Sequence, residues 1–154
     1  MLICNLEVRV VKKVLLINNQ NRPETESVAQ EMAGKLAKYN LEVIRRHAFS
    51  PPVQIEDADL AIVLGGDGTI LRTARYYAVM GIPLLGINMG RIGFLSKLEL
   101  SEVDEYLEPL IKGQYSFSER LMLDCQVLKH GEVVFQSYCL NEVAFRSTSP
   151  LMVG

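Results

Sequence analysis

The sequence lacks several features that would assign a protein to a class at once. Its three cysteines form no Cys-x-x-Cys pair, so we do not expect a zinc site. Its formal net charge of −2 shows no basic excess, which argues against a nucleic-acid partner. No run reaches the roughly 18 apolar residues of a membrane span, and residues 1–11 lack a basic leader and a small-residue cleavage site. These absences favour a cytoplasmic protein with reduced thiols and no membrane partner.

The composition is that of an ordinary globular protein, with 49% hydrophobic and 22% charged residues. A chain of 154 residues is long enough for one compact domain but short for two. Because there is little net charge, any phosphate site must be built locally from backbone amides or a few placed cations. His47 and His130 have no carboxylate or cysteine neighbours in the sequence, and we assign both to the surface.

Short apolar runs alternate with helical patterns over the first part of the chain. The expected strands are residues 14–17, 41–44, 59–64 and 84–87, and the expected helices are residues 23–40 and 69–79. Strands that are apolar throughout and alternate with helices indicate a parallel sheet covered on both faces. A third helix is expected after a capping box of Ser101 and Asp104, with a kink or an early end at Pro109.

The pattern changes after Gly113. Apolar and polar residues alternate over residues 121–127, His130 and Gly131 indicate a turn, and residues 133–145 form a second extended run. These segments predict a hairpin that begins an antiparallel region. A lone hairpin is marginal in water because it leaves an apolar face uncovered. We therefore expect more of this region downstream or on another chain.

The strongest indication of function is the run GGDGT, residues 65–69, between an expected strand and an expected helix. Its glycines let the backbone approach a ligand, and amides at a helix start attract phosphate. A carboxylate repels phosphate, so Asp67 indicates a group that orients a hydroxyl, accepts its proton or holds a magnesium ion. The alternative is a tight turn in which Asp67 caps the helix. We favour function because this five-residue form is uncommon, and it is neither a Walker A loop nor the GxGxxG fingerprint. The other residues assigned to ligand binding in this run are Gly65, Gly66, Gly68 and Thr69.

A second glycine-containing loop, INMGRIGFLS at residues 87–96, also follows a strand. Open parallel sheets bind ligands at this edge, so the two loops are expected to lie together. Phe94 and Leu95 could form the wall of a site for an adenine or nicotinamide ring, or both could be core residues; the sequence leaves both open. We assign Asn88, Phe94 and Leu95 to ligand binding.

Two further features give weaker indications. Asn141 and Glu142 interrupt an apolar run, so one of them would point inward unless the strand bends or ends there. A bound nucleoside would satisfy such buried groups, but a solvated edge or bulge explains the pair equally well. Arg72 and Arg75 could reach phosphates from the helix after GGDGT, although a solvated helix face is the commoner explanation. We include Arg72 among the ligand-binding residues.

Taken together, GGDGT, INMGRIGFLS and LNEV (residues 140–143), in that order, resemble the NAD kinase family. GGDGT alone also suits diacylglycerol and sphingosine kinases, and phosphofructokinases carry a close relative of it. The other two motifs narrow the choice to NAD kinase. The resemblance extends over about residues 14–147.

The resemblance implies an enzyme that transfers the γ-phosphoryl group of ATP, or in some members polyphosphate, to the 2′-hydroxyl of the adenosine ribose of NAD. The product is NADP, and the reaction uses a divalent metal, usually Mg²⁺. It also implies that Asp67 is the catalytic carboxylate, that the GGDGT glycines lie by phosphates, and that Phe94, Asn141 and Glu142 contact the dinucleotide. No side chain is assigned as a metal ligand.

The resemblance further implies a Rossmann-like, phosphofructokinase-like α/β domain followed by a β-rich domain, with the active site between them, in a homo-oligomer. We therefore divide the chain into an α/β nucleotide-binding domain, residues 1–116, and the truncated start of a β-rich domain, residues 117–154. The TGSTAY-type segment that completes the family's site has no counterpart here, so we expect this chain alone to bind NAD poorly and turn over little. A diacylglycerol-type lipid kinase and a non-catalytic nucleotide-binding module stay as alternatives.

Overall fold

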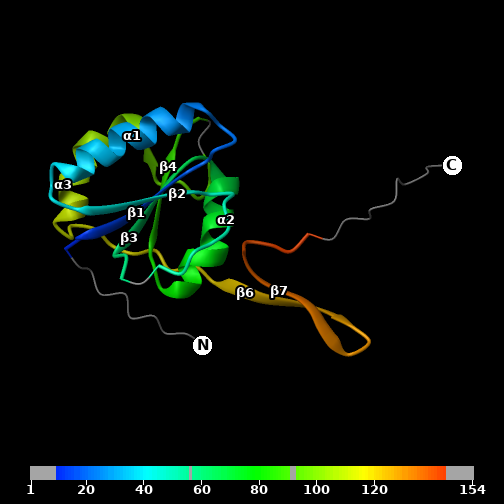
Figure 1. Ribbon diagram of the computed structural model, residues 1–154. Helices are drawn as coiled ribbons and strands as arrows, with labels where there is room; N and C mark the ends of the chain where they lie inside the picture. The colour runs from blue at the N-terminus through cyan, green and yellow to red at the C-terminus, as the bar shows by residue number, and fades with distance from the viewer. Residues whose placement is uncertain (1–9, 56, 91–92, 145–154) are drawn as a thin grey trace.

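A parallel five-stranded sheet with helices on both faces forms the body of the molecule, and a two-stranded hairpin projects from it (Figure 1). The computed structural model describes residues 10–55, 57–90 and 93–144. The strands of the large sheet, in the order β2-β1-β3-β4-β5, are β1 (Lys13–Asn18), β2 (Glu42–His47), β3 (Leu60–Leu64), β4 (Leu84–Asn88) and β5 (Leu98–Glu99). The helices are α1 (Glu24–Ala37), α2 (Asp67–Tyr77) and α3 (Val103–Ile111), with short 3₁₀ turns η1 (Ala78–Met80) and η2 (Leu100–Glu102). The expected α/β fold with a small antiparallel unit is confirmed.

The sheet has a separate core on each face, because successive residues of a strand point to opposite sides. Leu16 and Ile62 pack in the cluster under α1 and α3, whereas Leu15 and Ala61 pack in the cluster on the α2 side. All four are at most 1% exposed. This burial on both faces explains why the strands read as continuous apolar runs.

Three local expectations are corrected at the helix starts and in the sheet. Helix α2 begins at Asp67, earlier than expected, so this residue lies in its first turn. The capping box before α3 is formed by Glu99 and Glu102, and the prediction of Ser101 and Asp104 was wrong. The chain passes directly from β5, which was not predicted, into η2, so the N-cap residue is Glu99, two positions before Ser101. Pro109 lies inside α3, which ends shortly afterwards at Ile111.

The predicted hairpin is present as β6 (Met122–Lys129) and β7 (Glu132–Leu140). His130 and Gly131 form its turn with φ of 53° and 86°, the positive values that two-residue hairpin turns favour. His130 is exposed, as is His47, which confirms the surface assignment of both histidines. Strand β7 ends at Leu140, short of the expected residue 145.

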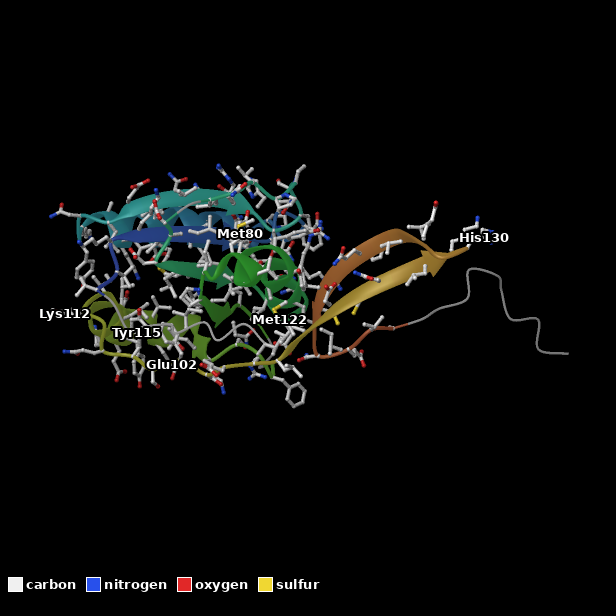
Figure 2. The ribbon with its side chains drawn as sticks, turned by 90° about the horizontal axis from the view of Figure 1, so that it is seen from below. Met80, Glu102, Lys112, Tyr115, Met122 and His130 are labelled. Atoms are coloured by element: carbon white, nitrogen blue, oxygen red, sulfur yellow. The ribbon has the colours of Figure 1, made fainter. Side chains whose placement is uncertain are left out.

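One face of the hairpin carries apolar side chains that the described residues leave about half exposed. The register places Leu123 opposite Cys139 and Val127 opposite Phe135 on this face. Leu123, Val127 and Phe135 are 45%, 47% and 59% exposed. Figure 2 shows the two strands extending away from the α/β body, with His130 at the far end. The expectation that a lone hairpin leaves an apolar face uncovered is therefore met within the described part of the chain.

The thiols of Cys125 and Cys139 are free, and their sulfur atoms lie 3.6 Å apart across the hairpin. Burial, followed by the hydrogen bond with Cys139, raises the pKa of the Cys125 thiol above its usual value. Because only the thiolate reacts, we expect iodoacetamide to alkylate folded Cys125 about threefold or more slowly than the urea-unfolded chain at pH 8. Quenched time points, analysed by peptide mass spectrometry, measure both rates. Equal rates in the folded and unfolded chain at pH 8 would contradict this expectation.

Within the described ranges, no helix is both long enough and apolar enough to cross a lipid bilayer.

Candidate functional site

Three loops meet at the edge where β1, β3 and β4 end, because these strands are parallel neighbours in the sheet. The loop after β3 carries the GGDGT run, and the loop after β4 carries the second motif. The backbone N–H of Gly65 donates to the carbonyl of Ile87 over 3.1 Å, which ties the two loops together where they leave the sheet. The expected meeting of the two motifs at one edge is therefore observed.

The GGDGT run forms the tight strand-to-helix turn that its glycines predict. A Cβ added at Gly65 would lie 2.6 Å from Oγ1 of Thr69, so only glycine lets the start of α2 come this close. Thr69 is buried, and its Oγ1 accepts a hydrogen bond from Nδ2 of Asn19 over 3.2 Å. Around Gly66 and Gly68, in contrast, an added Cβ would meet nothing within 4 Å. The turn is thus packed on its Thr69 side and open at these two glycines.

The Asp67 carboxylate is half-buried at the start of α2 and turns toward the second loop. Its Oδ2 accepts a hydrogen bond from the backbone N–H of Phe94 over 2.8 Å, and its Oδ1 accepts one from Leu95 over 3.1 Å. The N-cap of α2 is Gly66, and no side-chain bond caps this helix. The alternative that Asp67 serves as a helix cap is therefore wrong. Both oxygens of the candidate catalytic carboxylate are instead oriented by the neighbouring loop.

Phe94 and Leu95 are neighbours in the sequence but lie in opposite environments. Leu95 is buried and packs in the small cluster with Val63 and Ile70 on the α2 side of the sheet. The side chain of Phe94 is 92% exposed beside the Asp67 loop. Leu95 is thus a core residue, whereas the Phe94 ring is free to contact a ligand.

Asn88 is buried at the end of β4, where it shapes the start of the second loop. Its Oδ1 accepts a hydrogen bond from the N–H of Gly90 over 3.2 Å, and its Nδ2 donates to the carbonyl of Gly90 over 3.1 Å. Both polar ends of the Asn88 side chain are therefore engaged within the loop. Its assignment as a ligand contact stays a prediction.

Asn141 and Glu142 follow the end of β7, so they do not interrupt a strand. Asn141 has a φ of 80°, and both side chains are exposed. The sequence left open whether one of the two side chains points inward or the strand ends there, and the strand ends at Leu140. Leu140 packs against the cluster that holds Ile70 of α2 and Leu95 of the second loop, which carries the Asn-Glu pair toward these elements. Their role in dinucleotide binding stays a prediction.

Arg72 lies on α2 but is engaged away from the glycine loops. Its Nε donates to the carbonyl of Ala48 over 2.8 Å, and its guanidinium stacks 4.7 Å from the centre of the Phe49 ring. The ring of Tyr76 lies on the same cation at 5.9 Å. These contacts hold the turn after β2 against α2. The prediction that Arg72 binds phosphate is not tested by this arrangement, which gives the side chain a structural role.

Two residues of the loop after β1 belong to this edge and were not singled out from the sequence. Asn19 contacts Thr69, as described above, and Nη1 of Arg22 lies 3.7 Å from the position of a Cβ at Gly90. Arg22 is exposed and makes no ion pair within residues 10–55, 57–90 and 93–144. From the sequence, the polar run at residues 18–21 indicated only a loop. Its place in the site follows from β1 lying beside β3, and no local sequence pattern predicts that strand order.

No group of three or more His, Cys, Asp or Glu side chains that could hold a metal ion occurs among the described residues.

Comparison with known proteins identifies a matching family model and several relatives. The family model described as the ATP-NAD kinase N-terminal domain matches residues 37–115. An NAD kinase of Natranaerobius thermophilus is 38% identical over an alignment of 144 residues, and the match covers 86% of this chain and 50% of that protein. An NAD kinase of Azoarcus sp. is 49% identical over 86 residues, which are 56% of this chain and 29% of that protein.

Solved structures show the same fold at low sequence identity. The yeast NADH kinase complexed with NADH matches with a TM-score of 0.68 and 20% identity, covering 84% of this chain and 47% of that one. An NAD kinase from Archaeoglobus fulgidus in complex with ATP matches with a TM-score of 0.53 and 20% identity, covering 74% and 40%. The chain spans about half the length of the curated relatives from Natranaerobius thermophilus and Heliobacterium modesticaldum.

Proposed function

The chain belongs to the NAD kinase family, and from that premise we propose that the complete gene product that carries it is an ATP-dependent NAD kinase of NADP biosynthesis. The 2′-hydroxyl oxygen of the adenosine ribose of NAD attacks the γ-phosphorus of ATP. The bond between that phosphorus and the β–γ bridging oxygen breaks, and the products are NADP, ADP and a proton. Asp67 accepts the proton of the attacking hydroxyl.

The observation that carries this proposal is the position of Asp67. Its carboxylate lies at the ligand-binding edge of a parallel sheet, between two glycine-containing loops, with both oxygens oriented by backbone amides. Peptide N–H groups orient a carboxylate without giving it a proton. Each oxygen therefore keeps acceptor capacity for a substrate hydroxyl.

Phosphates of the donor are proposed to lie at the open side of the GGDGT turn. Gly66 and Gly68 leave room there, and the first amides of α2 favour an anion. Arg22 supplies an exposed guanidinium at the neighbouring loop, and such a group can bind phosphate oxygens in pairs. With a net charge of only −2 for the whole chain, this local cation supports a phosphate site that composition alone did not indicate.

The dinucleotide is proposed to contact Phe94, Asn141 and Glu142. The exposed ring of Phe94 offers an apolar face for an adenine or nicotinamide ring. Asn141 and Glu142 offer an amide and a carboxylate in a segment that follows Leu140 toward the same loops. These groups provide the donors and acceptors that a nucleoside needs.

Magnesium fits this site as a companion of the ATP phosphates. Mg²⁺ in phosphoryl-transfer sites is commonly held by one or two carboxylates together with substrate phosphates, and Asp67 supplies one carboxylate at the described edge. When bound, the ion offsets the negative charge of the transferred phosphoryl group. We therefore propose Asp67 as the residue whose carboxylate would contact a bound Mg²⁺ ion.

We further propose a cytoplasmic location and a homo-oligomeric assembly for the complete gene product. Free thiols at Cys125 and Cys139 support a reducing compartment. The exposed apolar face of the hairpin supports a requirement for a further packing partner. Without that partner, we expect this chain in isolation to have poor activity.

The test is an assay of the complete gene product with NAD, ATP and Mg²⁺, in which NADP is measured through an NADP-specific dehydrogenase. We expect NADP formation and no phosphorylation of diacylglycerol presented in detergent micelles. Phosphorylation of diacylglycerol without NADP formation would favour the lipid kinase. Nucleotide binding without either reaction would favour a non-catalytic module. In a parallel assay, the 154-residue chain is expected to form little NADP, and efficient turnover by it would contradict that expectation.

A further inference from the structure

The loop that follows β4 does more than border the candidate site. Consecutive backbone N–H groups of Phe94 and Leu95 donate to the two oxygens of the Asp67 carboxylate, at 2.8 Å and 3.1 Å. We propose that this loop is a positioning device for Asp67, and that Gly93 is the positioning residue on which the contact depends. The consequence for catalysis rests on the proposed function, whereas the contact itself does not.

Gly93 is required because the Asp67 carboxylate occupies the space of a side chain at this position. A Cβ added to Gly93 would lie 2.2 Å from Oδ1 of Asp67, 2.7 Å from Cγ and 3.0 Å from Oδ2. The carboxylate can avoid this clash by rotating, but it then leaves the N–H groups of the next two residues, which hold it in place. An alanine at position 93 therefore displaces Asp67 from both donors, or displaces the loop from Asp67.

The same loop contains a glycine that lacks this constraint. A Cβ added to Gly90 would lie 3.7 Å from Nη1 of Arg22, which is an ordinary van der Waals separation. Gly90→Ala thus makes the same chemical change at a position with room for it. This variant is the matched control for Gly93→Ala.

Both oxygens of Asp67 bond to the loop after β4 and not to the helix that carries the residue. An aspartate that caps the start of a helix accepts N–H groups of that helix. In this molecule no side-chain bond caps α2, and the acceptors of Asp67 reach across to residues 27 and 28 positions later. Two donors on consecutive residues fix the plane of the carboxylate as well as its place, which is what a proton acceptor needs to meet a substrate hydroxyl.

The first test measures amide hydrogen exchange of this chain by NMR. Because the Phe94 side chain is 92% exposed, its amide would exchange rapidly without the bond to Asp67. We expect protection of the Phe94 and Leu95 amides by about tenfold or more in the unchanged chain. Asp67→Ala should abolish the protection at both. Asp67→Asn should weaken it at one amide, because in the same orientation the Nδ2 group, a donor, faces one of the two N–H groups.

The glycine variants complete this test. Gly93→Ala should remove the protection of both amides, whereas Gly90→Ala should leave it within about twofold. Exchange of the β3 amides reports whether each variant is folded. Unchanged exchange at Phe94 and Leu95 in Asp67→Ala would overturn the proposal even if Gly93→Ala does not fold, and retained protection in folded Gly93→Ala would also overturn it.

The second test measures NADP formation by the complete gene product. Gly93→Ala should lower kcat by about 10- to 100-fold, with the KM values for NAD and ATP within about threefold. When Asp67 is already replaced by asparagine, Gly93→Ala should lower kcat no further, because Gly93 acts only by positioning the Asp67 carboxylate. An equal kcat loss in both backgrounds would overturn the positioning role. Exchange results as expected, with no NADP formed by the unchanged protein, would leave the contact standing and refute the proposed function.

Discussion

Replacing Asp67 by asparagine is expected to lower kcat for NADP formation by about 10²- to 10⁴-fold, the usual contribution of a general base. The asparagine side chain has nearly the same shape, but it cannot accept the proton of the attacking hydroxyl. In the same orientation its Nδ2 group, a donor, also replaces one of the two oxygens that accept from Phe94 and Leu95. Initial rates with NAD, ATP and Mg²⁺ in the complete gene product measure the effect.

A carboxylate elsewhere on the surface provides the control for this substitution. Asp104 is exposed on α3 and pairs with Lys35 of α1, on the opposite face of the sheet from α2. Asp104→Asn should change kcat by less than about twofold, because Asp104 lies away from the candidate site and its exposed ion pair contributes little to stability. If Asp67→Asn retains kcat within the same limit, Asp67 is not the proton acceptor, and the non-catalytic binding module becomes the leading hypothesis. Asp67→Asn removes both the proton acceptor and part of its contact with the loop. Gly93→Ala separates these two effects, because it disturbs the position of the Asp67 carboxylate and leaves its charge.

Leu16→Ala is expected to lower the free energy of unfolding by about 3–4 kcal/mol, within the range measured for buried leucines. Leu16 lies in β1, between β2 and β3, and is 1% exposed in the core under α1 and α3. The loss combines the transfer of the leucine side chain from water with the cavity that an alanine leaves. Urea unfolding followed by circular dichroism measures it, with the slope m compared between the variant and the unchanged chain.

Leu121→Ala makes the same change at a site that is 84% exposed. Its effect on the free energy of unfolding should be within about 0.5 kcal/mol, because little apolar area leaves or enters water. A cost below about 1 kcal/mol for Leu16→Ala would contradict the packing described for the α1 face of the sheet. Similar costs for both variants would indicate that Leu121, which precedes β6, is buried in solution.

Several site assignments could not be decided before the tertiary structure was known, although their residue types were recognised. Phe94 and Leu95 are adjacent, so no periodicity separates an exposed ring from a core side chain in a loop. Arg72 fits a phosphate ligand by its position after GGDGT, yet its guanidinium is engaged with Ala48 and Phe49. That contact depends on the turn after β2 lying against α2, which the sequence near Arg72 does not specify.

The sequence alone determined the features that depend on local sterics and burial. Apolar runs separated by helical patterns specify buried parallel strands, because side-chain direction repeats along each element. The glycines of GGDGT specify the turn from β3 into α2, since an added Cβ at Gly65 would meet Thr69 only a few residues away. These interactions are close in sequence, so they can be read from it.

Only the tertiary structure decided what Asp67 contacts. Its partners at Phe94 and Leu95 are 27 and 28 residues away, and the contact exists because β4 lies beside β3 with a register that brings their loops together. The same holds for Asn19 beside Thr69, which follows from β1 lying on the other side of β3. Strand order and register are set by packing across the whole sheet, and no local pattern of residues records them.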